Sequence, residues 1–269
     1  MIRFSKFNFG TLIFGYGFLY VPILYLMVYS FNDSRIIGVW AGFSLRWYAK
    51  LVEDDVMISA VLNSFEIAAI TATVAVALGT MAALIMVRFK RFCGRTLFSG
   101  LVSAPLVMPE VITGLAILLM FVTLERAIGW PSERGMLTIT IAHITLTMAY
   151  VYLVVQARLA DFDMSLEEAA MDLGARPSTV FFKITLPIIS PSLLSGWLLA
   201  FALSLDDVVV ASFLAGPGST TLPILVFSSV RTGVTPELNA LATIIVGIVS
   251  IGILISGLLM YRRASKKIY

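Results

Sequence analysis

Four carboxylates lie inside long apolar stretches of this 269-residue sequence, where few other charges occur. They are Glu66, Glu110 and the adjacent pair Asp206 and Asp207. An ionised side chain in hydrocarbon costs about 2.5 kcal/mol or more, so such residues usually pair with a group of opposite charge. Two adjacent carboxylates repel each other unless one is protonated or a cation lies between them. The chemistry that these residues suggest is therefore reversible binding of a cation.

The composition indicates that these stretches lie in a membrane. Hydrophobic residues make up 59% of the chain and charged residues 13%, whereas about 25% of a soluble domain is charged. A disordered chain would have lower hydrophobicity and more charge. The net charge of +3 does not provide the clustered basic surface of a nucleic-acid-binding protein. The sequence is therefore expected to be an integral membrane protein in contact with the lipid bilayer, with no nucleic acid as partner.

Charges separate six apolar runs, each long enough for one helix across about 30 Å of hydrocarbon. The runs are continuous rather than alternating, so the sequence predicts helices and not membrane-spanning strands. Pro105 and Pro109 should kink the third helix, and a Gly-Pro-Gly sequence should end the fifth. The predicted spans of this single transmembrane domain, residues 1–269, are about 10–31, 61–87, 99–123, 137–157, 191–215 and 239–261.

The distribution of Lys and Arg orients these spans. With six spans, both termini share one side with the loops 88–98 and 158–190, and 13 of the 19 Lys and Arg residues fall on that side. The positive-inside rule therefore places both termini in the cytoplasm. The first apolar run is longer than the apolar core of a signal peptide, and no small-residue cleavage site follows it closely. We expect it to remain as a membrane anchor.

The sequence lacks the motifs of several enzyme classes. The dipeptide Gly-Lys does not occur, so the chain has no phosphate-binding loop of the GxxxxGK[ST] type. His143 and Cys93 are the only residues of their types, which excludes a metal site built from His and Cys. We expect no cofactor in this chain. His143 lies in the middle of a predicted span, where a histidine is more often hydrogen-bonded to another helix than part of a proton relay.

The segment 158–190 differs from the other predicted cytoplasmic loops because it is long and acidic. Residues 165–174 have the pattern of a short helix, with Ser165 as N-cap, acidic residues in the first turn and Gly174 as the stop. Ala169 and Ala170 are small and allow another surface to approach closely. Gly174 is expected to need a left-handed backbone or a close approach to a neighbouring surface.

The order of residues in this segment resembles the signature of ABC importer permeases, which reads EAA, three residues, Gly, nine residues, then I-x-L-P. Every element is present at its spacing. The resemblance implies an all-α, six-helix membrane protein with the type I importer architecture and no enzymatic activity of its own. It also implies that the signature residues dock on an ATPase. They are Glu168, Ala169, Ala170, Gly174, Ile184, Leu186 and Pro187.

The same resemblance implies the partners of the chain. A permease of this family works in the bacterial inner membrane with a second permease, here expected to be a homologue, and with a periplasmic substrate-binding protein. Separate ATPase subunits bind ATP and Mg²⁺. The strings from Ser30 to Ser34 and from Gly42 to Tyr48 are similar to the polyamine branch of the family. The expected function is ATP-driven import of a small organic cation, either putrescine or spermidine.

Two other functions stay open at this point. An ion-coupled secondary transporter for amines or amino acids would have broken helices near the middle of the membrane, which the Pro-containing runs allow. Such a transporter has no use for the signature segment. A membrane-embedded enzyme would need a pair of acid–base groups, for which only Asp206 and Asp207 are available.

In a transport pathway, Asp206 and Asp207 are the first candidates for contact with the cation. Adjacent helical residues point about 100° apart, so we expect one of them to face the pathway. The other is expected to cap a helix end or to bond to a neighbouring serine. Glu110 is either a second pathway contact or a carboxyl bonded to the backbone that the prolines open. Glu66 is a weaker member of the same set.

Overall fold

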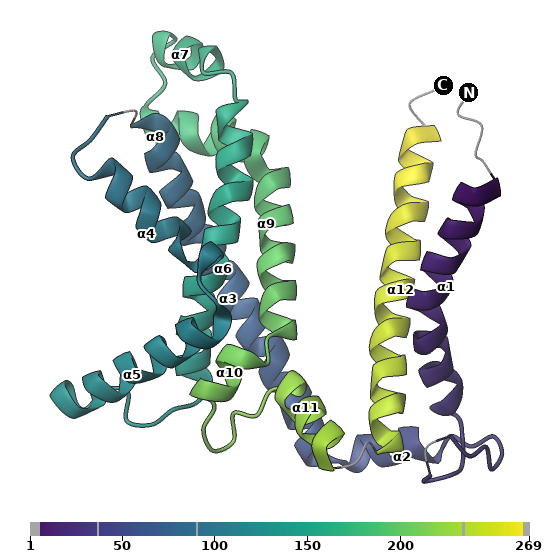
Figure 1. Ribbon diagram of the computed structural model, residues 1–269. Coiled ribbons are helices and arrows are strands. Elements are labelled where there is room, and N and C mark those ends of the chain that lie inside the picture. The colour runs from purple at the N-terminus through teal and green to yellow at the C-terminus, as the bar shows by residue number, and fades with distance from the viewer. Residues whose placement is uncertain (1–5, 37, 90, 233–234, 266–269) are drawn as a thin grey trace. The chain divides into compact units, whose positions relative to one another are not determined.

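The structure is a computed structural model that describes the backbone of residues 6–36, 38–89, 91–232 and 235–265. Side chains are described for residues 8–36, 38–89, 91–231 and 235–251. Within these ranges the chain is almost entirely helical, and its β structure is one isolated bridge between Asn32 and Phe43 (Figure 1). The prediction of an all-α fold is therefore confirmed. The chain divides into two compact units, residues 1–58 with 228–269, and residues 59–227.

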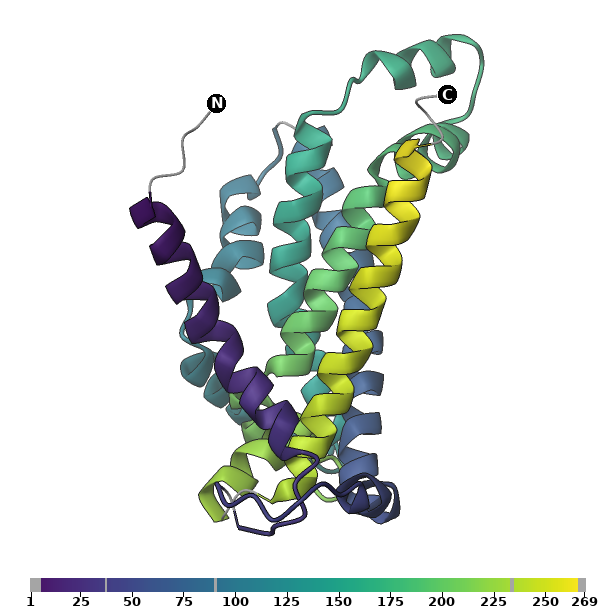
Figure 2. The ribbon, with the colours of Figure 1, turned by 90° about the vertical axis from the view of Figure 1, so that its right-hand side faces the viewer.

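The first unit is built on α1 (Lys6–Tyr29), α2 (Arg46–Glu53) and α12 (Pro236–Ser265). Helices α1 and α12 contact each other, meeting near α2 and diverging toward the two termini, and α2 packs against α12 (Figures 1 and 2). Trp47 of α2 is 2% exposed and donates its indole N–H to the carbonyl oxygen of Asn32. Lys50 of the same helix forms an ion pair with Glu237 of α12. These contacts fix the segment between α1 and α2 against the rest of the unit.

The second unit is built around α6 (Met136–Ala160), which packs against α4, α5, α9 and α10 and also lies close to α3. Small residues bring the long helices close together. A Cβ atom on Gly79 would lie 2.9 Å from the Met148 carbonyl oxygen and 2.9 Å from Val151 Cβ, so only glycine fits there. The other helices of the unit are α3 (Asp55–Arg88, from Ser59 on), α4 (Arg95–Val107), α5 (Glu110–Ile128), α7 (Ser165–Asp172), α8 (Pro177–Val180), η1 (Phe181–Thr185), α9 (Leu186–Asp206), α10 (Val209–Leu214) and α11 (Leu222–Thr232, as far as Phe227).

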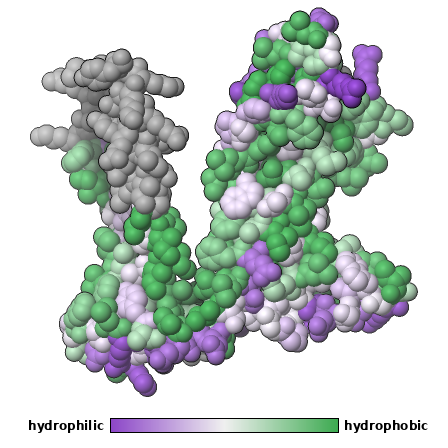
Figure 3. All heavy atoms as spheres, turned by 180° about the vertical axis from the view of Figure 1, so that it is seen from behind, coloured by the Kyte–Doolittle hydropathy of each residue, from purple (hydrophilic) through white to green (hydrophobic). Residues whose placement is uncertain are grey.

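Five helical segments are long and apolar enough to cross a membrane, judged by length and composition over the described residues. They are Asn8–Tyr29, Asp55–Arg88, Glu110–Ile128, Met136–Ala160 and Pro177–Asp206. The predicted sixth span, 239–261, falls on α12, and its part after residue 251 lies outside the described side chains. In the second unit, apolar side chains cover the flanks of the long helices and hydrophilic ones gather near α7 (Figure 3).

The predicted helix over 99–123 is wrong as one continuous element. Helix α4 ends at Val107 and α5 begins at Glu110, and Met108 between them is extended with a ψ of 134°. Pro109 has no N–H to donate and disfavours the helical conformation of the residue before it. This proline therefore ends the helix rather than only kinking it, whereas Pro105 is accommodated inside α4.

The predicted helix over 191–215 is also interrupted. A continuous helical run begins earlier, at Pro177, passes through η1 and α9, and stops at Asp206. Asp207 is extended, with a ψ of 122°, and α10 follows it. The π-helical turn η1 precedes Pro187, which has no N–H, and the N–H of Leu186 bonds to the carbonyl oxygen of Phe181 five residues back.

Candidate functional site

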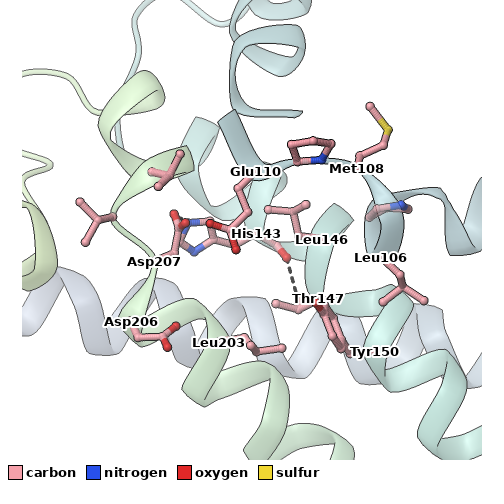
Figure 4. A pocket seen from close by; sticks show the side chains of 14 residues that line it. Leu106, Met108, Glu110, His143, Leu146, Thr147, Tyr150, Leu203, Asp206 and Asp207 are labelled. Carbon is pink, nitrogen blue, oxygen red and sulfur yellow. Dashed lines mark hydrogen bonds and ion pairs between the residues drawn. The ribbon is translucent and has the colours of Figure 1, made fainter. Parts of the chain in front are cut away.

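A cavity of about 550 Å³ lies in the second unit, between α4, α5, α6 and the joint of α9 with α10 (Figure 4). Both helix interruptions line it, one through Pro109 and Glu110 and the other through Asp206 and Asp207. His143 of α6 lies between them in the lining. The cavity therefore brings together three of the four carboxylates that the sequence singles out.

The Asp207 carboxylate is surrounded by N–H groups. Its Oδ2 atom lies 3.0 Å from His143 Nε2 and accepts the backbone N–H of Ala211 at 2.8 Å. Its Oδ1 atom accepts the backbone N–H of Val210 at 3.3 Å. The side chain is only 11% exposed. Asp207 therefore caps α10, which is one of the two alternatives that the sequence left for this pair.

His143 connects α6 to the joint between α9 and α10. Its ring is 3% exposed, and its Nδ1 atom lies 2.8 Å from the hydroxyl oxygen of Ser204 in α9. Its other nitrogen faces Asp207. The sequence predicted a hydrogen bond from His143 to another helix, but gave no partner, because 64 residues separate His143 from Asp207.

Asp206 and Glu110 differ from Asp207 in their surroundings. Both side chains are exposed, and both line the cavity from helix ends (Figure 4). Within the part of the chain that the structure describes, neither forms an ion pair. Glu66 is exposed on α3 and does not line this cavity. The structure thus separates a fixed carboxylate, Asp207, from two carboxylates that remain open to a ligand.

The signature segment contains a second candidate site. The expected helix is present as α7, and Gly174 follows it with a φ of +85°, which confirms the predicted left-handed backbone. A Cβ atom on Gly174 would meet nothing within 4 Å, so no close approach inside this chain requires the glycine. The expectation that Ser165 is the N-cap is wrong. Ser165 is the first helical residue, and its N–H bonds to Asp163 Oδ1 at 3.0 Å.

Glu167 fixes α7 to the rest of the unit, and sequence reasoning did not identify it. The residue is 3% exposed, forms an ion pair with Arg88 at the end of α3, and accepts a hydrogen bond from the Thr185 hydroxyl in η1. The hydrogen bonds from Arg88 lower the pKa of the Glu167 carboxyl, although burial acts in the opposite direction. The local sequence gave no signal for this role, because the partners lie far away along the chain.

Other residues of α7 and of the turn after it are open to solvent. Glu168 and Ala169 are exposed, Met171 is 44% exposed and Leu173 is 90% exposed. Ala170 is half-buried. Apolar side chains gathered on an exposed helix are typical of a surface that another protein covers.

The second half of the signature lies in the helical run that follows α7. Ile184 is in η1, and Leu186 and Pro187 begin α9. Ile184 and Leu186 are half-buried, whereas Pro187 is exposed. These residues therefore link α7 directly to the long helix that ends at Asp206.

Comparison with known proteins defines the class of this chain. It belongs to the family of binding-protein-dependent transport system inner membrane components, whose family model matches residues 75–268. The chain is therefore a permease subunit of an ABC importer. This membership disfavours the secondary transporter and the membrane-embedded enzyme that the sequence left open.

Two of the relatives that match this chain are permeases of polyamine transport systems. The chain is 59% identical over 264 residues to the putrescine transport system permease protein PotI of Escherichia coli (strain K12), which covers 98% of this chain and 94% of that protein. It is 39% identical over 248 residues to the spermidine/putrescine transport system permease protein PotC of Haemophilus influenzae, covering 92% of this chain and 93% of that protein.

Solved structures share the fold at low sequence identity. A bacterial ABC transporter involved in the import of the acidic polysaccharide alginate matches with a TM-score of 0.70 and 16% identity, covering 94% of both chains. An amino acid ABC transporter with histidines matches with a TM-score of 0.54 and 19% identity, covering 81% of this chain and 98% of that chain. At this identity the likeness establishes the type I importer fold alone.

Proposed function

We propose that this chain carries putrescine, or a closely related polyamine, through the inner membrane of a bacterium. The observation that supports this most strongly is the 59% identity to a putrescine permease across 98% of the chain. The cavity agrees with a cationic cargo, because it is lined by carboxylates. A transporter of acidic alginate shares the fold at 16% identity, so the cargo depends on side chains rather than on the fold.

In this proposal the ammonium groups of the cargo meet carboxylates in the cavity. Asp206 and Glu110 are exposed and line it together, and Asp207 adjoins Asp206. Glu66 lies outside the cavity lining and is proposed as a weaker, separate contact. Apolar lining such as Tyr150 suits the methylene chain between the two ammonium groups. Binding is weak, because a cargo that passes through must also be released.

The chain works with partner subunits that supply energy and cargo. They are a second, homologous permease, ATPase subunits that bind ATP and Mg²⁺, and a periplasmic substrate-binding protein. In support, one relative of the same fold was solved in complex with a periplasmic protein bound to an alginate pentasaccharide. The signature residues dock on the ATPase through the exposed part of α7, with Glu168 and Ala169 at the contact. The ion pair between Glu167 and Arg88 passes the movement to α3.

The proposed orientation of the chain in the membrane places both termini in the cytoplasm. With both termini in the cytoplasm, 13 of the 19 Lys and Arg residues lie on the cytoplasmic side, in agreement with the positive-inside rule. Helix α7 then lies on the side where ATP is available. The cavity lies at the other end of α9, where Leu203 and Asp206 line it.

The experiment that tests the proposal is uptake of labelled putrescine by the complete complex in proteoliposomes. We expect uptake to require both ATP and the loaded binding protein. Excess unlabelled diamine should compete, whereas a monoamine of the same length should compete weakly. Uptake driven by a sodium or proton gradient without ATP would contradict the proposal, as would ATP-driven transport of uncharged solutes but not of putrescine.

A further inference from the structure

We propose that His143 is a positioning residue of the cargo path, which holds Asp207 at the joint of α9 and α10 so that Asp206 alone of the pair meets the cargo. The inference rests on the proposed function for the identity of the cargo. Its structural part, the control of Asp206 by His143, is independent of which cargo passes.

Asp207 already has hydrogen-bond donors at most of its acceptor positions. An ionised carboxylate has about four acceptor positions. Three N–H groups fill positions on Asp207, from His143, Val210 and Ala211. With the side chain only 11% exposed, little of the carboxylate is left to bind a passing ammonium group. Asp206 has no such set of donors and is exposed in the cavity.

The two hydrogen bonds of the His143 ring have a defined direction. An ionised carboxylate only accepts, so Nε2 of His143 must carry the hydrogen that faces Asp207. In the neutral imidazole, Nδ1 then accepts the hydroxyl hydrogen of Ser204. The order Ser204 to His143 to Asp207 satisfies each group. His143 and Ser204 are 3% and 6% exposed, so solvent has little access to either side chain.

His143 also holds the joint between α9 and α10 in place. Helix α9 ends at Asp206, and the extended backbone of Asp207 sets the direction in which the chain leaves it. His143 lies on α6, the helix around which the unit is packed, so it ties this joint to a rigid element. Without that tie, the two backbone N–H groups of α10 alone hold Asp207. The Asp207 carboxylate, which already borders the cavity, then becomes free to compete with Asp206 for the ammonium group.

Two substitutions of His143 separate the two contacts of the ring. In His143→Gln the side-chain amide nitrogen reaches about as far as Nε2, so the donor to Asp207 is kept and the Ser204 contact is lost. In His143→Asn the amide lies near the place of Nδ1, so the Ser204 contact is kept and the donor to Asp207 is lost. This pair of variants is matched in polarity and differs in the contact that the proposal requires.

The first readout is the amount of putrescine imported per ATP hydrolysed in the same vesicles. Because the donor to a buried carboxylate is lost only in His143→Asn, we expect that variant to import about tenfold less per ATP. His143→Gln should stay within about twofold of the parent. Equal behaviour of the two variants, whether both active or both impaired, overturns the proposal.

The second readout needs no cargo. Cys93 is the only cysteine, so Cys93→Ser gives a background in which Asp206→Cys can be labelled selectively with a cationic methanethiosulfonate reagent. The labelling rate at position 206 should change several-fold with His143→Asn and stay unchanged with His143→Gln. Leu203→Cys, which lines the same cavity one turn earlier on α9, should label equally in both. An unchanged rate at position 206 in His143→Asn refutes the positioning role, even if putrescine proves not to be the cargo.

Discussion

Replacing Glu167 by alanine should release α7 from the rest of its unit. Glu167 is 3% exposed and pairs with Arg88, whose side chain is 24% exposed. Removing one partner of a buried ion pair costs about 3–5 kcal/mol, and the partial exposure of the arginine places this case near about 3 kcal/mol. The Thr185 hydroxyl, 1% exposed, also loses its acceptor. A loss of about 3 kcal/mol lowers the ratio of docked to undocked α7 by about 100-fold.

Hydrogen exchange of the α7 backbone amides in the assembled complex measures this ratio. In Glu167→Ala the protection of α7 should fall by about 100-fold, and ATP hydrolysis should respond less to the loaded binding protein. Asp172→Ala removes an exposed carboxylate from the same helix and serves as the control, with protection expected within about twofold of the parent.

A double substitution tests the physical cause. If the damage comes from an arginine left without its partner, changing both Arg88 and Glu167 to methionine should restore most of the protection, because an apolar pair replaces a buried ion pair at little cost. Protection within about twofold of the parent in Glu167→Ala would refute the anchoring role. A double variant as damaged as the single one would show that the unpaired charge is not the cause.

Three further experiments test the anchoring of α7, the turn after it and the packing of α3 on α6. Because the folded-state pKa of Glu167 is lowered, its stabilisation of α7 is fully present above the ordinary carboxyl value and is lost as pH falls from that value through the lower folded one. Protection should therefore be constant down to about pH 5, and a loss between about pH 7 and 5 contradicts this. Gly174→Ala should destabilise the turn after α7 by about 1 kcal/mol, because of the φ of +85°, and should reduce stimulated ATP hydrolysis. Gly174→Asn should have a smaller effect on both, and equal effects of the two variants would argue against backbone strain. Gly79→Ala should lower the midpoint of thermal unfolding, because its Cβ would lie 2.9 Å from the α6 backbone. Gly100→Ala in α4, with open space around the glycine, should leave the midpoint unchanged. Equal midpoints for the two variants would contradict the close helix contact.

The membrane helices were predictable because the thickness of the hydrocarbon layer acts on sequence length directly. Continuous apolar runs therefore indicated where long apolar helices lie, although two of the predicted helices, 99–123 and 191–215, are interrupted. The interruptions were harder to predict, because a proline has different effects in different packing. Pro105 and Pro191 lie inside helices, whereas Pro109 ends one, and the break at Asp207 contains no proline.

The sequence identified individual residues of the candidate site but not the contacts between them. Charges in apolar runs marked Asp206, Asp207 and Glu110, and the cavity brings the three together. The sequence could not supply partners, because these come from tertiary packing between distant segments. Arg88 and Glu167 lie 79 residues apart, and Glu167 looked like an ordinary acidic residue in the first turn of a helix.

The most direct test of the account is the number of putrescine molecules imported per ATP hydrolysed by the complete complex with Asp206→Asn. Because the charge of Asp206 is proposed to contact the cargo in the cavity, this ratio should fall by about tenfold relative to the parent. Asp206→Glu, which keeps the charge, should retain most of it. A ratio in Asp206→Asn equal to that of the parent, in complexes shown to be fully assembled, would contradict the account.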